Sequence, residues 1–402
     1  MMRKLTGFCC GKLAHRRVRA CTHATGSTRP PRGCKHPPYS LRATACAGRP
    51  GALWAAAVAT WLAMASTGAA IEPGFPGKHW QTKTPAELGL DKAKLDEFAR
   101  LAGGRGCVIR SGYMAYTWGD ATRASDIASA SKPLYSHLTF LAIQEGKLAG
   151  VDEKVAKYQP VLNDLNRRLG YKDRKLTFRH LAYQTACLGF EEEPGTAFDY
   201  NDLTMGLFWD TLVNKVYRVE WQDADEKLFR PKLADVLKFE DKFTCNGLKP
   251  GRPDISPRDF ARFGLLYLNQ GKWGNRQVLK AEFAKMALSQ PLPLSIPRTQ
   301  ARKAETCELR SIGGGGNQCD HNGGYSWLWW LNTVARDGRR WFPDAPADQF
   351  MALGHGGQRG MVVMPKLQLI VSWNDTKELH TDRELGNKAF QALAEAAGWR
   401  SE

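Results

Sequence analysis

The pattern of apolar positions divides the chain into two strand-rich ends and a helical middle. Apolar residues at helical spacing predict a helix in each of three segments: 86–102, 131–146 and 382–399. Most of the chain between about 136 and 295 has the same periodicity. Short apolar runs predict strands at 106–118 (a pair turning at Ser111 and Gly112), 325–333, 339–342, 350–355, 361–364 and 367–374. Strands at both ends of a helical middle indicate one antiparallel sheet built from the two termini, flanked by helices and with a helical insert, which is an α+β fold.

The first seventy residues have a different composition from the rest. Residues 1–50 contain eleven Lys or Arg and no acidic residue, and residues 51–70 contain no charge. Segment 53–65 is an apolar stretch of signal-peptide length, with Gly68 and Ala70 at −3 and −1 of a cleavage site before Ile71. We predict a basic leader and signal peptide over 1–70 and a folded domain over 71–402. An uncleaved membrane anchor is the alternative, and the sequence leaves open whether residues 1–50 are translated.

Charge gives no support for a nucleic-acid partner. The chain carries 57 basic and 40 acidic residues, a net charge of +17. Without the eleven basic residues of the leader, 46 basic and 40 acidic residues remain, a net charge of +6 that is spread along the domain. Such a balance is typical of a soluble protein.

Sequence motifs for other enzyme classes are missing. No Cys-x-x-Cys pair occurs in 71–402, and no His-Glu-x-x-His, Gly-x-Ser-x-Gly or phosphate-binding Gly-x-x-x-x-Gly-Lys-Ser/Thr motif occurs anywhere. We therefore expect no metal and no cofactor. The glycines of 313–316 are interpreted as a flexible surface loop, and the tryptophans at 327, 329 and 330 mainly as core, with a cleft wall as the alternative.

The segment Ser129-Ala130-Ser131-Lys132 is the strongest candidate for chemistry. Residues three apart on a helix share one face, so the Ser129 hydroxyl and the Lys132 amine are expected to meet. A lysine with a lowered pKa can accept the proton of a serine and make it a nucleophile. The motif alone is weak, because such pairs also arise by chance.

Two later segments strengthen the motif. Tyr200-Asn201-Asp202 precedes an apolar run, and Gly354-His355-Gly356-Gly357-Gln358 precedes two strands. In this order the three segments resemble the serine β-lactamase and penicillin-binding protein superfamily, which carries Ser-x-x-Lys, Tyr-x-Asn and Lys-Thr-Gly or His-x-Gly. The likeness runs from about 88 to 398 and is greatest for the branch of class C β-lactamases, D,D-carboxypeptidases and related esterases and amidases. It implies a β-lactamase/transpeptidase-like fold, with an α/β part over about 71–135 and 296–402 and a helical part over about 136–295.

The resemblance also implies roles for the motif residues. Ser129 would be the nucleophile, Lys132 would keep its hydroxyl polarised, and Tyr200 would carry the proton to the leaving group. The N–H groups of Ser129 and Gln358 would form the oxyanion hole.

Two positions depart from the family pattern. Asp202 replaces an asparagine, so its carboxylate can accept a hydrogen bond from Lys132 but cannot donate one to a substrate carbonyl. Its charge is expected to raise the pKa of Lys132 and to shift the proton transfer toward Tyr200. His355 and Gly356, which precede Gly357, replace a Lys-Thr pair that recognises a substrate carboxylate. We therefore expect a carboxylate to be held poorly.

Ten cysteines divide evenly between the leader (9, 10, 21, 34 and 46) and the domain. Cys307 and Cys319 flank the glycine-rich loop and could pair. Cys187 and Cys245, which the resemblance places beside the active-site cleft, are a second candidate pair, and five reduced thiols are the alternative. Cys107 lies in an apolar strand and is predicted to be a buried thiol.

The sequence therefore predicts a periplasmic or secreted serine hydrolase that cleaves a small-molecule ester or amide through an acyl-serine. A D,D-carboxypeptidase or β-lactamase is the alternative within this chemistry, and a non-catalytic binding or sensor domain is the alternative outside it. We expect no nucleic-acid partner and no membrane span after cleavage. The natural substrate, the ester or amide preference and the oligomeric state cannot be predicted.

Overall fold

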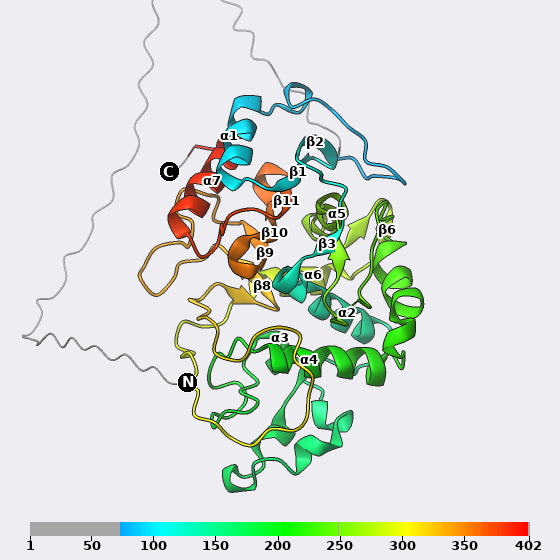
Figure 1. Cartoon of the computed structure of the whole chain (residues 1–402), viewed down its shortest axis with the longest axis vertical. Helices are drawn as coiled ribbons and strands as arrows, with labels where there is room; N and C mark the ends of the chain where they lie inside the picture. The colour runs from blue at the N-terminus through cyan, green and yellow to red at the C-terminus, as the bar shows by residue number, and fades with distance from the viewer. Residues whose placement is uncertain (1–72, 248, 401–402) are drawn as a thin grey trace, which may run out of the picture. The chain divides into compact units, whose positions relative to one another are not determined.

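The computed structural model describes residues 73–247 and 249–400, and the predicted leader and signal peptide over 1–70 lie outside them. A seven-stranded antiparallel sheet is the centre of the fold, as Figure 1 shows. In spatial order its strands are β2 (Tyr113–Trp118), β1 (Arg105–Arg110), β11 (Leu369–Asn374), β10 (Arg359–Met364), β9 (Phe350–Gly354), β8 (Trp329–Leu331) and β7 (Tyr325–Ser326). Two short antiparallel pairs lie outside it: β3 (Ser125–Asp126) with β4 (Asp254–Ile255), and β5 (Lys272–Trp273) with β6 (Arg276–Gln277).

The sheet joins the two ends of the domain. β1 pairs with β11 in an antiparallel register that runs from Arg105 opposite Asn374 to Arg110 opposite Leu369. β1 and β2 come from the N-terminal part, and the other five strands come from the C-terminal part. The predicted α+β fold is confirmed.

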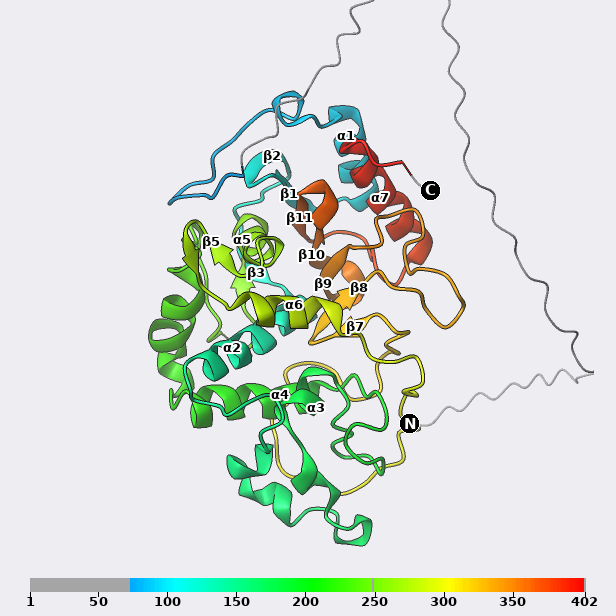
Figure 2. The ribbon, with the colours of Figure 1, turned by 180° about the vertical axis from the view of Figure 1, so that it is seen from behind.

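Helices cover both faces of the sheet (Figures 1 and 2). α1 (Lys92–Ala102) and α7 (Arg383–Ala396) lie side by side on one face and share an apolar cluster with it. α5 (Pro257–Leu268) packs against β1, β10 and β11 on the other face. The middle of the chain supplies α2 (Lys132–Gln144), α3 (Phe178–Ala182), α4 (Asp202–Asp210), α6 (Ala281–Ser289) and the π-helical segments η7 (Thr211–Val216) and η9 (Asp225–Ala234).

Short 3₁₀ segments connect the larger elements. They are η1 (Ala86–Leu88), η2 (Ala128–Ser131), η3 (Val155–Lys157), η4 (Pro160–Asn163), η5 (Arg167–Leu169), η6 (Lys172–Lys175), η8 (Trp221–Asp223), η10 (His355–Gly357) and η11 (Pro365–Leu367).

Three predicted elements differ from the structure. The helix predicted over 86–102 is divided, because Gly89 adopts a left-handed conformation that ends η1 before α1 begins. The strand predicted over 325–333 is two strands, since positive φ angles at Trp327 and Leu328 turn the chain between β7 and β8. The strand predicted over 339–342 is absent from the described residues. In this segment the chain has an isolated bridge between Val334 and Arg340 instead.

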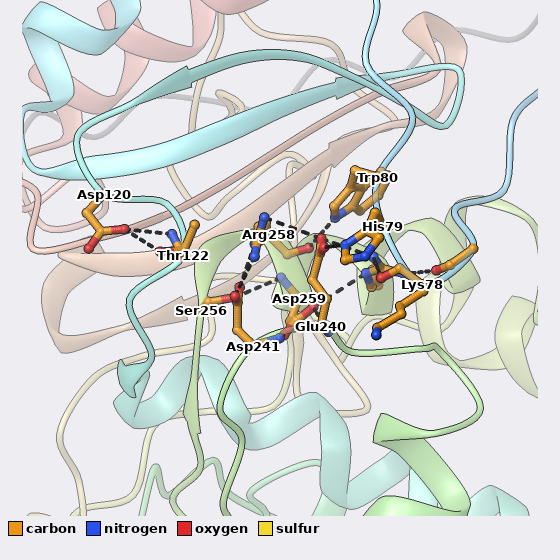
Figure 3. A network of polar contacts seen from close by, with 12 residues as sticks. Lys78, His79, Trp80, Asp120, Thr122, Glu240, Asp241, Ser256, Arg258 and Asp259 are labelled. Carbon is orange, nitrogen blue, oxygen red and sulfur yellow. Dashed lines mark hydrogen bonds and ion pairs between the residues drawn. The ribbon is translucent and has the colours of Figure 1, made fainter.

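The segment that precedes η1 is bonded to the first turns of α5, as Figure 3 shows. The Trp80 indole donates to the Arg258 carbonyl at 3.0 Å, and the Arg262 guanidinium lies 5.0 Å from the Trp80 ring. Arg262 also donates to the backbone carbonyls of Gly77 and Lys78. The folded domain therefore includes residues well before its first helix. None of the helices in the described part of the chain is long and apolar enough to cross a membrane.

Candidate active site

Ser129 and Lys132 lie at the junction between η2 and α2. The Lys132 ammonium donates to the Ser129 hydroxyl at 2.9 Å, so the contact expected from the spacing is present. Ser129 itself lies in the 3₁₀ turn, and Lys132 is the first residue of α2. The Ser129 side chain is partly exposed, whereas Lys132 is buried.

The end of β9 approaches the backbone of this turn. A Cβ atom on Gly354 would lie 2.5 Å from the Ile127 oxygen, closer than real contacts allow, and would crowd the Ser129 nitrogen at 3.0 Å. A glycine at this position is therefore what lets the end of β9 come close to the serine backbone. In 73–247 and 249–400 the Ser129 N–H has no hydrogen-bond partner, so it is free to donate to a developing oxyanion.

Tyr200 and Asp202 reach the same point from the start of α4. Asn201 caps this helix by accepting from the N–H groups of Leu203 and Thr204, which orients the residues on either side of it. Asp202 accepts from Lys132 at 2.7 Å, and the Lys132 ammonium lies 4.5 Å from the centre of the Tyr200 ring. The three motif residues predicted from the sequence are thus brought together around the Ser129 hydroxyl.

Charge at this cluster keeps Lys132 protonated. Burial lowers the pKa of Lys132, but the charge that Tyr200 gains when it ionises at high pH, together with the charge and hydrogen bond of Asp202, outweighs burial, and the pKa is raised. Burial raises the pKa of Tyr200, against the opposing effects of Lys132 and Ser129. Burial also acts to raise the pKa of Asp202, but Lys132 and the hydrogen bonds that Asp202 accepts lower it overall. At neutral pH the cluster therefore consists of an ammonium, a carboxylate and two hydroxyl groups.

Ser129 opens into a cleft of about 830 Å³. One part of its wall is aromatic, where the His380 ring lies between Trp330 and Trp341. Another part is cationic and contains Lys249, Arg252, Arg359. Besides Ser129, Tyr200 and Asp202, the cleft is lined by Asp126, Ala128, Gly313, Gly314, Gln318, Cys319, Asp320, Asn322, Leu353, His355, Gly356, Gly357 and Thr381.

The cationic wall is only partly neutralised. Arg252 pairs with the Asp126 carboxylate, and Arg359 donates to the same carboxylate at 3.3 Å. Lys249 is exposed and forms no ion pair within the described ranges 73–247 and 249–400. Asp126 also accepts from the Ala128 N–H at 2.7 Å, so this charge cluster is directly connected to the serine turn.

The segment 355–358 is a turn that separates β9 from β10. His355 is exposed, has a positive φ of 51°, and lines the cleft together with Gly356 and Gly357. The Gln358 N–H, which the sequence analysis predicts to form part of the oxyanion hole, makes a hydrogen bond within this turn. That N–H donates to the His355 carbonyl at 3.2 Å and closes the turn, and the Gln358 side chain donates to Glu378.

The predicted disulfides are absent, since all five cysteines of the described domain are free thiols. The Cys187 thiol is buried and donates to the Ala197 carbonyl at 3.3 Å, and burial raises its pKa to about 12. Its candidate partner Cys245 is also buried, with its N–H donating to Asp225. Cys319 turns toward the cleft instead of pairing with Cys307. Cys107 is fully buried, as predicted.

The glycine-rich loop and the cationic wall are parts of the site that the sequence analysis missed. Gly313 and Gly314 are exposed, as a surface loop should be, but they line the cleft and lie beside Asp202. Gln318 also lines the cleft and was not singled out. More than a hundred residues separate this loop from Asp202, and no motif in the sequence connects them. Of the three tryptophans, Trp330 lines the cleft, whereas the other two are buried in the core.

Residues 94–384 match the family model for Beta-lactamase. The chain belongs to the β-lactamase family. None of the curated proteins compared with the chain is a match. Among solved structures, a class C β-lactamase has 12% identity and a TM-score of 0.53, covering 79% of this chain and 98% of its own.

Two further solved structures are similar at the level of the fold. A penicillin-binding protein homologue from Caulobacter crescentus has 12% identity and a TM-score of 0.51, covering 79% of this chain and 99% of its own. A protein from Bacillus anthracis described as a 6-aminohexanoate-dimer hydrolase has 12% identity and a TM-score of 0.52, covering 81% and 89%. At these identities the likeness establishes the fold.

The raised pKa values predict an alkaline pH dependence. Lys132 and Tyr200 both hold their protons to higher pH than usual, so the form able to accept the Ser129 proton increases as pH rises. We expect kcat/KM for an uncharged aryl ester to keep rising from about pH 7 to about pH 10. A bell-shaped profile with its maximum near neutrality, measured after correction for spontaneous hydrolysis, would contradict this assignment of the protons.

Proposed function

We propose that the protein is an exported serine hydrolase that cleaves an ester or amide through an acyl-serine intermediate. The observation that carries the proposal is the position of Ser129 at the cleft, with its hydroxyl bonded to Lys132 and with Tyr200 beside them. A structural serine needs neither a buried lysine nor a cleft. Family membership supports the same chemistry.

The proposed reaction has two steps. In the first, the Ser129 oxygen attacks the substrate carbonyl carbon and its proton passes to the basic form of Tyr200 or Lys132, which returns it to the leaving group. The Ser129 N–H stabilises the negative charge that develops on the carbonyl oxygen. In the second step, water attacks the acyl-serine with the same groups acting in reverse, which releases the acid and restores the Ser129 hydroxyl.

The substrate is proposed to be a neutral ester or amide. Gly356 lacks the hydroxyl that the family threonine offers to a carboxylate, and His355 is not a permanent cation. A D,D-carboxypeptidase or β-lactamase is the second candidate. It is favoured by Lys249 and Arg359, which bring positive charge to the cleft from other elements.

The first prediction concerns the nucleophile. Ser129→Ala should abolish hydrolysis and labelling by a fluorophosphonate probe, because no other group in the cluster can form the acyl intermediate. Its melting temperature should stay close to that of the wild type, since Ser129 is partly exposed.

Ser131→Ala is the matched control. Its buried hydroxyl donates to the Ala128 carbonyl at 2.7 Å, so the variant should lose about 1 kcal/mol of stability and retain most of its turnover. Turnover by the Ser129→Ala variant would contradict the assignment of Ser129 as the nucleophile. A wild-type protein that neither turns over substrate nor reacts with the probe would favour a binding or sensor domain.

A second prediction separates the two substrate classes. We expect short-chain aryl esters or neutral amides to have a higher kcat/KM than nitrocefin or a D-Ala-D-Ala peptide, because ratios of this quantity measure differential transition-state binding. Replacing His355 by Lys and Gly356 by Thr together should shift the preference toward the carboxylate-bearing substrates. A preference of the wild type for nitrocefin or the peptide by about tenfold or more (about 1.4 kcal/mol) would establish the second candidate instead.

Export is part of the proposal and rests on the composition of 1–70. Cleavage before Ile71 would leave intact the segment at 77–80 that is bonded to α5. Mass spectrometry of protein purified from the cell envelope should give an N-terminus close to Ile71. Recovery of only full-length chain from the cytoplasm would show that the segment is not a signal peptide.

A further inference from the structure

The Asp202 carboxylate accepts hydrogen bonds on both of its oxygens. Lys132 donates to Oδ1 at 2.7 Å. The Gly314 N–H donates to Oδ2 at 2.7 Å, and the Gln318 side-chain amide donates to the same oxygen at 3.1 Å. All three partners are donors, and two of them come from the glycine-rich loop.

The loop is held firmly enough to act as a fixed partner. Its first end is attached where Arg310 forms an ion pair of 2.7 Å with Asp210 at the end of α4. Gly206 lies in α4 between Asp202 and Asp210. A Cβ atom on Gly206 would lie 2.0 Å from the Arg310 carbonyl oxygen, so the loop touches the surface of α4 directly. At its other end the Asn317 N–H donates to Asp199 at 2.7 Å.

The backbone of Asp202 is bonded to the same loop. The Ile312 N–H donates to the Asp202 carbonyl at 3.3 Å, and the Asp202 N–H donates to the Gly315 carbonyl at 3.4 Å. Loop residues thus surround Asp202 on the side opposite Lys132, and residue 202 is the point where the loop meets the catalytic cluster.

This set of donors explains why an aspartate replaces the asparagine of the family motif. An asparagine has one acceptor and one donor group on its side chain. At position 202 its amide nitrogen would face either the Lys132 ammonium or the N–H groups of Gly314 and Gln318. A donor would then oppose a donor, and only a carboxylate satisfies both sides.

We infer that Gln318 is a positioning residue of the active site, which together with the Gly314 N–H fixes the Asp202 carboxylate so that its other oxygen holds Lys132 against Ser129. This inference rests on the proposed function. The Gln318 side chain hydrogen-bonds to Asp202 and forms no hydrogen bond with Ser129 or Lys132 among the described residues, so it acts on them through Asp202. Its side-chain amide also donates to the Gly315 carbonyl, which orients it within the loop.

Two substitutions should move the pH profile in opposite directions. Gln318→Ala removes a donor that partly neutralises the Asp202 charge, so Lys132 should hold its proton more tightly and the rising limb of kcat/KM should move to higher pH. Asp202→Asn removes the charge that raises the pKa of Lys132 and Tyr200, so the limb should move to lower pH. A loss of packing alone would not shift the rising limb of kcat/KM in opposite directions in the two variants.

The experiment measures kcat and KM of the full domain on one uncharged aryl ester across this pH range. Gln318→Ala should lower kcat by about fivefold to tenfold with KM changed less than about twofold, because the attacking geometry is lost and substrate binding is not. Gln318→Glu, which sets an acceptor against the carboxylate, should lower kcat further. Gln277→Ala is the matched control, since Gln277 is also exposed and its side-chain amide donates to two backbone carbonyls away from the cleft.

A double variant keeps the test valid even if one of the single variants is poorly folded. In the double variant with Asp202→Asn and Gln318→Glu, the carboxylate introduced at position 318 accepts from the amide introduced at position 202. The kcat of the double variant, relative to the wild type, should therefore be higher than the product of the relative kcat values of the two single variants. Independent effects in the double variant, or a Gln318→Ala enzyme with unchanged kcat and pH profile, would overturn the inference. A wild-type enzyme that neither hydrolyses the ester nor reacts with the fluorophosphonate probe would instead overturn the proposed function.

Discussion

The buried ion pair between Lys132 and Asp202 is the interaction on which the site depends. The two side chains are 2% and 7% exposed, and they join the start of α2 to the start of α4. Charges removed from water in this way are tolerated only when the geometry is good and the remaining polar atoms are satisfied. Removing one partner of such a pair typically costs about 3–5 kcal/mol, since the other charge is left buried and unpaired. The neighbouring hydrogen bonds of Ser129 and of the glycine-rich loop are what satisfy the pair.

This constraint places the surrounding elements. Because Lys132 must reach Asp202, α2 and α4 begin side by side, and Tyr200 comes to lie next to the Lys132 ammonium. Because Gly354 allows close approach, the end of β9 lies against the Ser129 backbone from the other direction. The cleft therefore forms where the helical part of the chain meets the sheet, and its walls are supplied by loops from both.

The sequence was sufficient to predict the elements and residues with local signals. Short apolar runs identify most of the sheet, and the spacing of Ser129 and Lys132 predicts their contact. Interactions between distant segments gave no such signal. The contact of Asp202 with Gln318 depends on how a loop folds back along α4. The Gln358 N–H donates to a carbonyl in its own turn, and the amino-acid composition of that segment does not predict this hydrogen bond. The candidate disulfides could not be predicted for the same reason, since neither proximity in sequence nor proximity to a cleft determines where a thiol points.

Covalent labelling of the unmodified protein tests the central claim most directly. A fluorophosphonate probe should add once per chain, and peptide mapping by mass spectrometry should place the adduct on Ser129, with a labelling rate that rises with pH as Lys132 and Tyr200 lose their protons. An adduct on any other residue, or the absence of an adduct at alkaline pH, would contradict the assignment of Ser129 as a nucleophile activated by this cluster.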